Sequence, residues 1–198
     1  MIKQTKQIKN LIKQFIKESL ALVLSLTVAV LSLAYFGSEL INHMKAKEAE
    51  KMHQAQIVLR YEKEKACIIE ALYYESRSEG INGITAVASV LYNRKNSNLY
   101  PGTYCKVVQQ YKQFSYTLEN KALGKALEAS LPASEEQVYS YIVHTSNSLL
   151  NGTFKPSLIP SVMWYHALSA NPVWISSKSR VKKIGKHIFY RSKGKDKK

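Results

Sequence analysis

Aspartate is almost absent from this 198-residue chain. The one Asp, Asp196, lies in a basic run at the C-terminus, so a carboxylate that acts inside a folded domain must come from Glu. Neither cysteine, Cys67 or Cys105, has a second Cys or His at the short spacing of a zinc site, and no HExxH pattern occurs. These absences argue against zinc amidases and zinc endopeptidases, and we expect neither a metal nor a cofactor.

The scarcity of cysteine leaves two states open for Cys67 and Cys105. Two separate buried thiols are the common outcome for such a pair. A disulfide is the alternative if the domain is exported to an oxidising compartment.

Acidic residues are also scarce at both ends of the chain. Residues 1–17 contain five Lys and no acid, and residues 178–198 contain ten Lys or Arg against Asp196. Such segments attract polyanions such as anionic lipid, wall polymers or nucleic acid. Because no helix-turn-helix, zinc finger or aromatic RNA-binding signature occurs, we expect no sequence-specific nucleic acid binding.

A long apolar run follows the first basic segment. Residues 20–36 are apolar except for Ser25, Thr27 and Ser32, and as a helix they would span roughly 26 Å. We predict a single-pass transmembrane signal anchor over residues 19–38 after a cytoplasmic segment, 1–18. The excess of Lys before the run places the N-terminus in the cytoplasm and the rest of the chain on the periplasmic or wall side of the inner membrane.

Two other interpretations of the apolar run stay open. A cleaved signal peptide is the first, because residues 32–34 (SLA) offer small residues at the separation that a signal peptidase needs. A buried core helix is the second, although the run has no polar face.

The remaining chain is predicted to be mainly helical with a few short strands. Residues 39–64 are rich in Ala, Glu and Lys and lack Gly and Pro, which predicts a helical linker before a domain over 65–191 and a basic tail over 192–198. Within the domain we predict one helix that ends near Glu75, a second capped by Asn82, and a third that begins in a capping box of Ser134 and Gln137. Aromatic runs at 162–166 and 184–190 predict short strands or extended loops.

Glu75 is the candidate for chemistry. Ile68, Ala71 and Leu72 share its helical face, so the carboxylate points where a core would be. Burial favours the protonated form, which is how a protein makes a general acid. The alternative is that Glu75 ends the helix at the water boundary.

Several short motifs follow one another in residues 66–191, namely ALYYESRSEG at 71–80, Gly83, AVASVLYNR at 86–94, QFS at 113–115, WYH at 164–166 and IGKHIFY at 184–190. Taken together, they resemble the ordered landmarks of the SleB-type, spore-cortex-lytic cell-wall hydrolase family. Ser76 and Ser78 depart from the family's small Ala and Gly, and Ile84 replaces a frequent Gln.

This resemblance implies a lysozyme-like domain that cleaves the bond between N-acetylmuramic acid and N-acetylglucosamine, generally as a lytic transglycosylase. Glu75 matches the family's catalytic glutamate. Glycosidases usually carry a second carboxylate about 5–10 Å away. Glu79 can be structural instead, paired with Arg77 or Arg94, and Glu70 faces elsewhere on the helix.

Candidate contacts to the glycan strands of peptidoglycan come from aromatic and polar side chains. Aromatic rings stack on sugars, and amide, hydroxyl and imidazole groups bond acetamido and hydroxyl groups, although each residue can equally be structural. The candidates are Glu79, Asn93, Gln113, Phe114, Ser115, Tyr165, His166, Trp174 and Tyr190.

Two alternatives to an anchored lytic transglycosylase, and the origin of the protein, stay open at this point. A hydrolytic muramidase would recruit a second group such as Glu79. A non-catalytic wall-binding protein would keep the fold without turnover. The sequence also fits either a bacterium that remodels its own wall or a phage endolysin that lyses a host.

Overall fold

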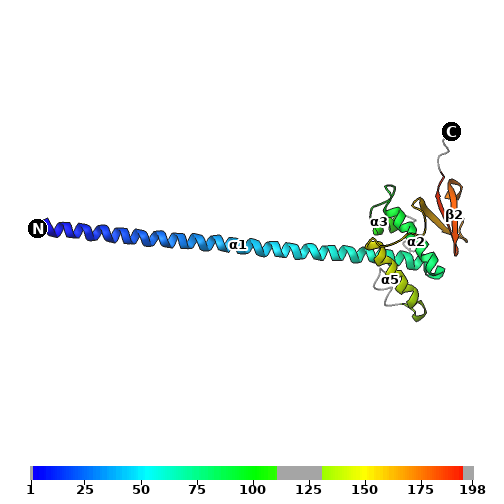
Figure 1. The fold of residues 1–198 in the computed structure, drawn as a ribbon, viewed down its shortest axis with the longest axis horizontal. Helices are drawn as coiled ribbons and strands as arrows, with labels where there is room; N and C mark the ends of the chain where they lie inside the picture. Colours follow the sequence, from blue (N-terminus) through cyan, green and yellow to red (C-terminus); the bar gives the residue numbers. More distant parts are fainter. Residues whose placement is uncertain (1, 111–130, 194–198) are drawn as a thin grey trace, which may run out of the picture. The chain divides into compact units, whose positions relative to one another are not determined.

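The computed structural model describes residues 2–110 and 131–193 (Figure 1). The chain divides into two compact units, Met1–Ile57 and Val58–Lys198. Helix α1 (Ile2–Ser76) begins in the first unit and ends in the second, without interruption.

The first unit contains the apolar run, and this run is exposed along its whole length. Leu33 and Phe36, for example, keep 72% and 70% of their surface accessible. The hydroxyls of Ser25, Thr27 and Ser32 each donate to a carbonyl oxygen three residues earlier, at 2.8 Å. Because the helix satisfies these polar groups itself, they add little cost in an apolar solvent. By length and composition, this helix is able to cross a membrane.

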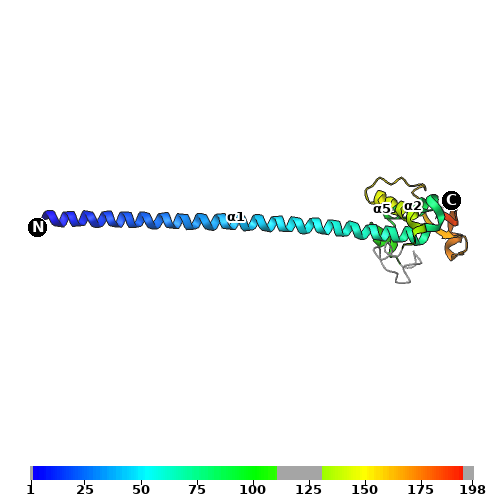
Figure 2. The same ribbon diagram turned by 90° about the horizontal axis from the view of Figure 1, so that it is seen from below.

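The core of the second unit is helical. It joins the last turns of α1 to α2 (Gly80–Lys95), α3 (Tyr104–Val108) and α5 (Glu136–Leu150), as Figures 1 and 2 show. α2 contacts α3, α5 and the sheet, and its residues Val87, Val90 and Leu91 are fully buried. The predicted mainly helical domain with a few short strands is therefore confirmed.

The sheet has three antiparallel strands in the order β1-β3-β2. They are β1 (Val162–Ala167), β2 (Lys178–Ile184) and β3 (His187–Ser192), and a 3₁₀ helix, η4 (Val173–Ser177), precedes β2. The aromatic run at 184–190 is thus the end of one strand, a turn and most of the next. Gly185 makes this turn possible because its φ of 56° is unfavourable for residues with a side chain.

α1 ends where the sequence predicts, one residue after Glu75. The Ser76 hydroxyl donates to the Leu72 carbonyl at 2.6 Å, and the 3₁₀ turn η1 (Arg77–Glu79) redirects the chain. Gly80, with a φ of 63°, then starts α2. The predicted cap at Asn82 is wrong, because α2 begins two residues before it.

The predicted capping box at Ser134 and Gln137 is also wrong. A 3₁₀ turn, η3 (Ala133–Glu135), occupies this position, and no side chain caps the start of α5. Glu135 is held elsewhere, since it accepts a hydrogen bond from the Tyr73 hydroxyl and lies 3.6 Å from Arg77. Burial, followed by this contact, raises the pKa of Tyr73 to about 12.

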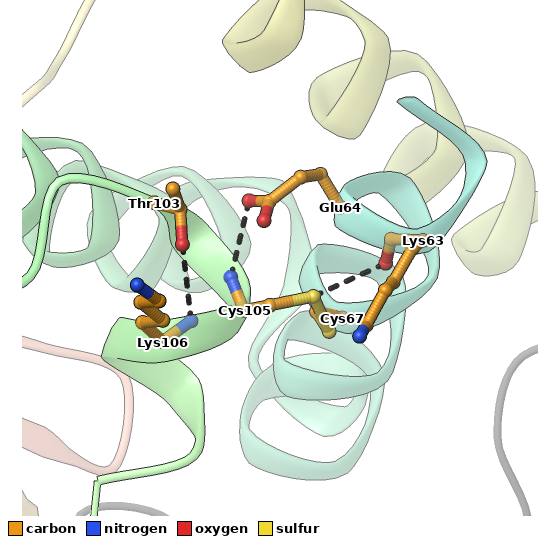
Figure 3. The surroundings of a disulfide bond; sticks show 6 residues. All are labelled: Lys63, Glu64, Cys67, Thr103, Cys105 and Lys106. Carbon is orange, nitrogen blue, oxygen red and sulfur yellow. Dashed lines mark hydrogen bonds between the residues drawn. A yellow bond between two sulfur atoms is a disulfide. The ribbon is translucent and has the colours of Figure 1, made fainter. Parts of the chain in front are cut away.

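Cys67 and Cys105 form a disulfide, so the interpretation as two separate thiols is wrong. α3 packs beside α1 and brings the two Cα atoms to 5.2 Å (Figure 3). The Cys105 N–H donates to Glu64 Oε2 at 3.1 Å, and the Thr103 hydroxyl caps α3 by accepting from the Lys106 N–H. These contacts fix the short helix against α1 two turns before Glu75.

Removal of the disulfide should destabilise the second unit strongly. Because the bridge closes a loop with a sequence separation of 38, Cys67→Ala/Cys105→Ala should lower its free energy of unfolding by roughly 4 kcal/mol. Urea unfolding of the full chain in a neutral detergent measures this. A reductant should destabilise the wild type to the level of the double variant and leave that variant unchanged. Equal stability of all three samples would contradict the prediction.

Candidate active site

Glu75 lies at the end of α1 with its carboxylate at the edge of the core. Ile68 and Leu72, on the same helical face, are completely buried, and Glu75 itself is half-buried with Oε1 beneath the surface. Its Oε2 accepts a hydrogen bond from the Tyr165 hydroxyl at 3.3 Å. The sheet thus contributes directly to the surroundings of the carboxylate.

Arg94 interacts electrostatically with Glu75. It is buried at the end of α2, and its Nε donates to the Met163 carbonyl of β1 at 2.8 Å. Burial lowers the pKa of Arg94, while the nearby Tyr100, Tyr165 and Glu75 oppose this shift. The interaction with Glu75 therefore offsets part of the cost of burying a guanidinium.

Glu79 is bound by the turn between β2 and β3. Its side chain is only 4% exposed, and its Oε2 accepts from the Lys186 N–H at 2.6 Å. The Ser78 hydroxyl donates to Oε1 at 3.3 Å. A methyl group added to Gly185 would lie 2.2 Å from Oε2, so this turn accommodates the carboxylate only because residue 185 is glycine.

The predicted pairing of Glu79 with Arg77 or Arg94 is wrong. Arg77 lies beside Glu135 and over the Tyr73 ring, 4.7 Å from its centroid. Glu79 has a different neighbour, because His187 Nδ1 lies 3.9 Å from Oε2. Glu79 therefore connects η1 to the turn of the sheet.

His187 links Glu79 to Tyr165, the residue that bonds Glu75. Its ring is buried and meets the edge of the Tyr165 ring at a centroid distance of 5.2 Å. Burial lowers the pKa of His187 below its ordinary value, and the Glu79 carboxylate opposes part of this effect. Glu79, His187, Tyr165 and Glu75 consequently form a continuous series of contacts.

Three predicted binding residues gather on one aromatic cluster, formed by His166, Trp174 and Tyr190. The His166 and Tyr190 rings stack at 5.3 Å, and Trp174 meets both rings edge-on. His166 Nδ1 lies 2.8 Å from the Ala167 carbonyl, which only accepts, so Nδ1 carries the proton. His166 Nε2 lies 3.0 Å from the Tyr190 hydroxyl, within hydrogen-bond distance.

Asn93 does not join this cluster. It is buried, and its Nδ2 donates to the carbonyls of Ile159 and Val162 at 2.8 and 3.0 Å. This side chain fixes the segment that enters β1, so the structure corrects the prediction of a substrate contact. Gln113, Phe114 and Ser115 lie outside the described residues.

Two residues are absent from the predicted site residues. Arg94 interacts with Glu75, and His187 packs on Tyr165, which bonds Glu75. Both belong to motifs that the sequence already displays, YNR and GKH. Their role depends on which atoms they meet in the fold, and no spacing along the chain indicates this. Glu70, which the helical spacing turns away from Glu75, is nevertheless buried.

A hollow of about 530 Å³ lies between the start of α2 and α5. Its walls include Gly80, Ile81, Tyr141 and His144, and none of the predicted site residues in the described part of the chain lines it. Within residues 2–110 and 131–193, no group of three or more His, Cys, Asp or Glu is arranged to hold a metal ion.

Comparison with known families decides the classification. The model of the Cell Wall Hydrolase family matches residues 78–190, which is more than half of the chain. The chain belongs to the cell wall hydrolase family. The match begins three residues after Glu75 and includes Arg94, Tyr165 and His187.

Curated relatives of this cell wall hydrolase are spore cortex-lytic enzymes. The enzyme of Oceanobacillus iheyensis is 32% identical over 123 residues, which cover 60% of this chain and 38% of the relative. That of Bacillus subtilis is 27% identical over 122 residues, covering 62% and 35%. The matched part thus spans less than two fifths of these relatives.

Among solved structures, the chain is similar to the catalytic domain of the germination-specific lytic transglycosylase SleB from Bacillus anthracis. The identity is 25%, the TM-score is 0.49, and the match covers 65% of this chain and 93% of that one. The SleB catalytic domain of Bacillus cereus matches with 26% identity and a TM-score of 0.47.

The contact between Glu79 and Gly185 can be tested with a matched pair of glycines. Gly152 also has a positive φ, 73°, but a methyl group there would meet nothing within 4 Å. Gly152→Ala should therefore cost roughly 1 kcal/mol of stability, and Gly185→Ala roughly 2–4 kcal/mol. In a Glu79→Ala background, Gly185→Ala should cost no more than Gly152→Ala. Equal costs for both glycines in the wild type would contradict this contact.

The lowered pKa of His187 predicts how stability depends on pH. Between this lowered value and about 6.5, the value in an unfolded chain, the unfolded state binds more protons, so stability falls as the pH falls through this window. His187→Gln should remove this part of the dependence, as measured by urea unfolding over a pH series. His144→Gln, at an exposed position, is the control. An unchanged pH profile in His187→Gln would contradict the assignment.

Proposed function

We propose that this chain cleaves the glycan strands of peptidoglycan as a lytic transglycosylase, with Glu75 as its general acid and base. The observation that carries the proposal is the position of Glu75, half-buried at a helix end and hydrogen-bonded by Tyr165. Membership of the cell wall hydrolase family and the spore cortex-lytic relatives support the substrate class.

The geometry of Glu79 favours a transglycosylase over a two-carboxylate muramidase. A second catalytic carboxylate would have to approach the sugar or a water molecule. The Glu79 side chain is buried and bound by the Lys186 N–H, so it is committed to the β2–β3 turn. This observation supports a mechanism in which one carboxylate performs both proton transfers.

The two transfers balance without water. Glu75 donates its proton to the glycosidic oxygen while the bond from this oxygen to C1 of the muramic acid residue breaks. The Glu75 carboxylate then removes the proton from the 6-hydroxyl of the same sugar, and the freed oxygen bonds to C1. The products are a 1,6-anhydro-muramic acid end and a free 4-hydroxyl on N-acetylglucosamine, and Glu75 is protonated again.

Tyr165 is suited to position the carboxylate for these steps. Its hydroxyl reaches Oε2, and its ring packs against Phe189 and His187, with centroids 5.6 and 5.2 Å away. Such packing limits the movement of the hydroxyl. We include Tyr165 and the aromatic cluster of His166, Trp174 and Tyr190 in the proposed sugar-binding surface, and the QFS residues 113–115 remain part of the proposal.

We also propose that residues 19–38 anchor the chain in the inner membrane, with the catalytic domain on the wall side. The exposed apolar surface of residues 20–36 needs an apolar surrounding, and the Lys-rich segment before it favours a cytoplasmic N-terminus. The disulfide between Cys67 and Cys105 supports this orientation, because disulfides persist in oxidising compartments.

Glu75→Gln should abolish the release of soluble fragments from purified sacculi. The amide cannot supply or take the proton, so we expect a loss of roughly 10²–10⁴-fold in rate with an unchanged melting temperature. Glu62→Gln, an exposed position on the same helix, should retain activity. Mass spectrometry of the wild-type products should show 1,6-anhydro ends.

Other outcomes of this experiment separate the alternatives. Reducing ends would indicate a hydrolytic muramidase. Sacculus binding without any release by the wild type would indicate a non-catalytic wall-binding protein. Full activity of Glu75→Gln would exclude Glu75 as the acid.

A further inference from the structure

The β2–β3 hairpin is strongly cationic and contains no acidic residue. The sequence has no Asp or Glu between residues 137 and 195. Within this stretch, seven basic residues lie on or beside the two strands, namely Lys178, Arg180, Lys182, Lys183, Lys186, Arg191 and Lys193. Most of this charge therefore belongs to the folded sheet.

Three of these cations lie on β2 and are exposed, namely Arg180, Lys182 and Lys183. The register of β2 against β3 shifts between Arg180 and Lys182, so these side chains project from both faces of the strand. In the described part of the chain β2 pairs with β3 alone, so its other edge presents backbone N–H groups as well as side chains. The fold thus places donors and cations side by side along an extended edge.

These three cations form no ion pair within residues 2–110 and 131–193. Among the described residues, no carboxylate lies within 4 Å of the Arg180, Lys182 or Lys183 side chains, whereas two flanking cations have partners. Lys178 Nζ lies 3.9 Å above the Trp164 ring, and Lys193 Nζ donates to the Ser176 carbonyl at 2.6 Å. Glu79, which bonds the turn of the hairpin, is buried beneath it.

We propose that the exposed edge of β2 binds a linear wall polymer whose units are joined by phosphodiesters. The three cations lie within four residues of one strand, which rises roughly 3.3 Å per residue, so a linear polyanion that runs along the edge can reach cations on both faces of the strand. Displacement of counterions from the polymer then drives binding. The wall as the source of the polymer rests on the proposed wall-side location, while the site itself is independent of Glu75.

This surface would keep the enzyme at the wall during turnover. Phosphodiester polymers carry one negative charge per unit. The three cations form no ion pair with another described residue, so binding of the polymer breaks no such pair. Contacts through charge alone remain labile, because each exposed pair is weak and screened by salt. The enzyme can therefore move along the polymer while the catalytic site acts on adjacent glycan strands.

The test compares two triple variants of the full chain in neutral detergent micelles. The first is Arg180→Gln/Lys182→Gln/Lys183→Gln. The control is Arg60→Gln/Lys106→Gln/Lys155→Gln, which removes one Arg and two Lys from exposed positions of the same unit outside the sheet. The probe is a fluorescent glycerol-phosphate oligomer, and the readout is its Kd at several salt concentrations.

We expect the β2 variant to bind the oligomer at least about tenfold more weakly at low salt, with a shallower salt dependence. The control should bind as the wild type does, and both should melt at the wild-type temperature. Glu75→Gln should also bind normally, so a failure of the proposed catalysis would leave this result intact. Equal weakening in both triple variants, or none in either, would overturn the proposal.

Competition distinguishes the source of the phosphate. Unlabelled oligomer should displace the probe more effectively, per phosphate, than short-chain phosphatidylglycerol or duplex DNA. If the lipid headgroup competes better, the edge binds membrane and the wall polymer is the wrong partner. Stronger competition by DNA would likewise overturn the assignment.

Discussion

The hydrogen bond from Tyr165 to Glu75 joins the end of a helix to a strand that lies 90 residues later in the chain. A carboxylate at this depth needs a partner, because burial penalises its charged form. The sheet supplies the hydroxyl, and Arg94 supplies a positive charge from α2. The arrangement around Glu75 therefore exists only when the helices and the sheet are packed together.

Several other contacts serve to keep these parts together. Asn93 and Arg94 bind carbonyl groups at the start of β1 and thereby hold this strand against α2. Glu79 binds the β2–β3 turn from the other side. The disulfide secures α3 to α1 two turns before Glu75. Asn93, Arg94 and Glu79 thus position the elements around Glu75, and the commitment of Glu79 to the turn supports the proposed mechanism with one carboxylate.

Charge and apolar surface are distributed unevenly along the chain, and each has a physical consequence. The first unit carries an exposed apolar run whose hydroxyl groups are satisfied within the helix, as a lipid environment requires. The second unit carries exposed cations on β2, far in sequence from the Lys residues that precede the run. The cations of β2 and the apolar run therefore belong to different units of the chain.

The sequence alone determined the helical character of the chain, the apolar run and the end of α1 beside Glu75, because these depend on composition and on periodicity within a few turns. It also indicated the family through ordered motifs. It did not determine the disulfide, the partners of Glu79 or the structural role of Asn93. Those outcomes depend on which segments meet in space. The two cysteines lie 38 positions apart, and the turn at Gly185 that receives Glu79 lies more than 100 positions after it. Packing brings these groups together, and no local pattern encodes it.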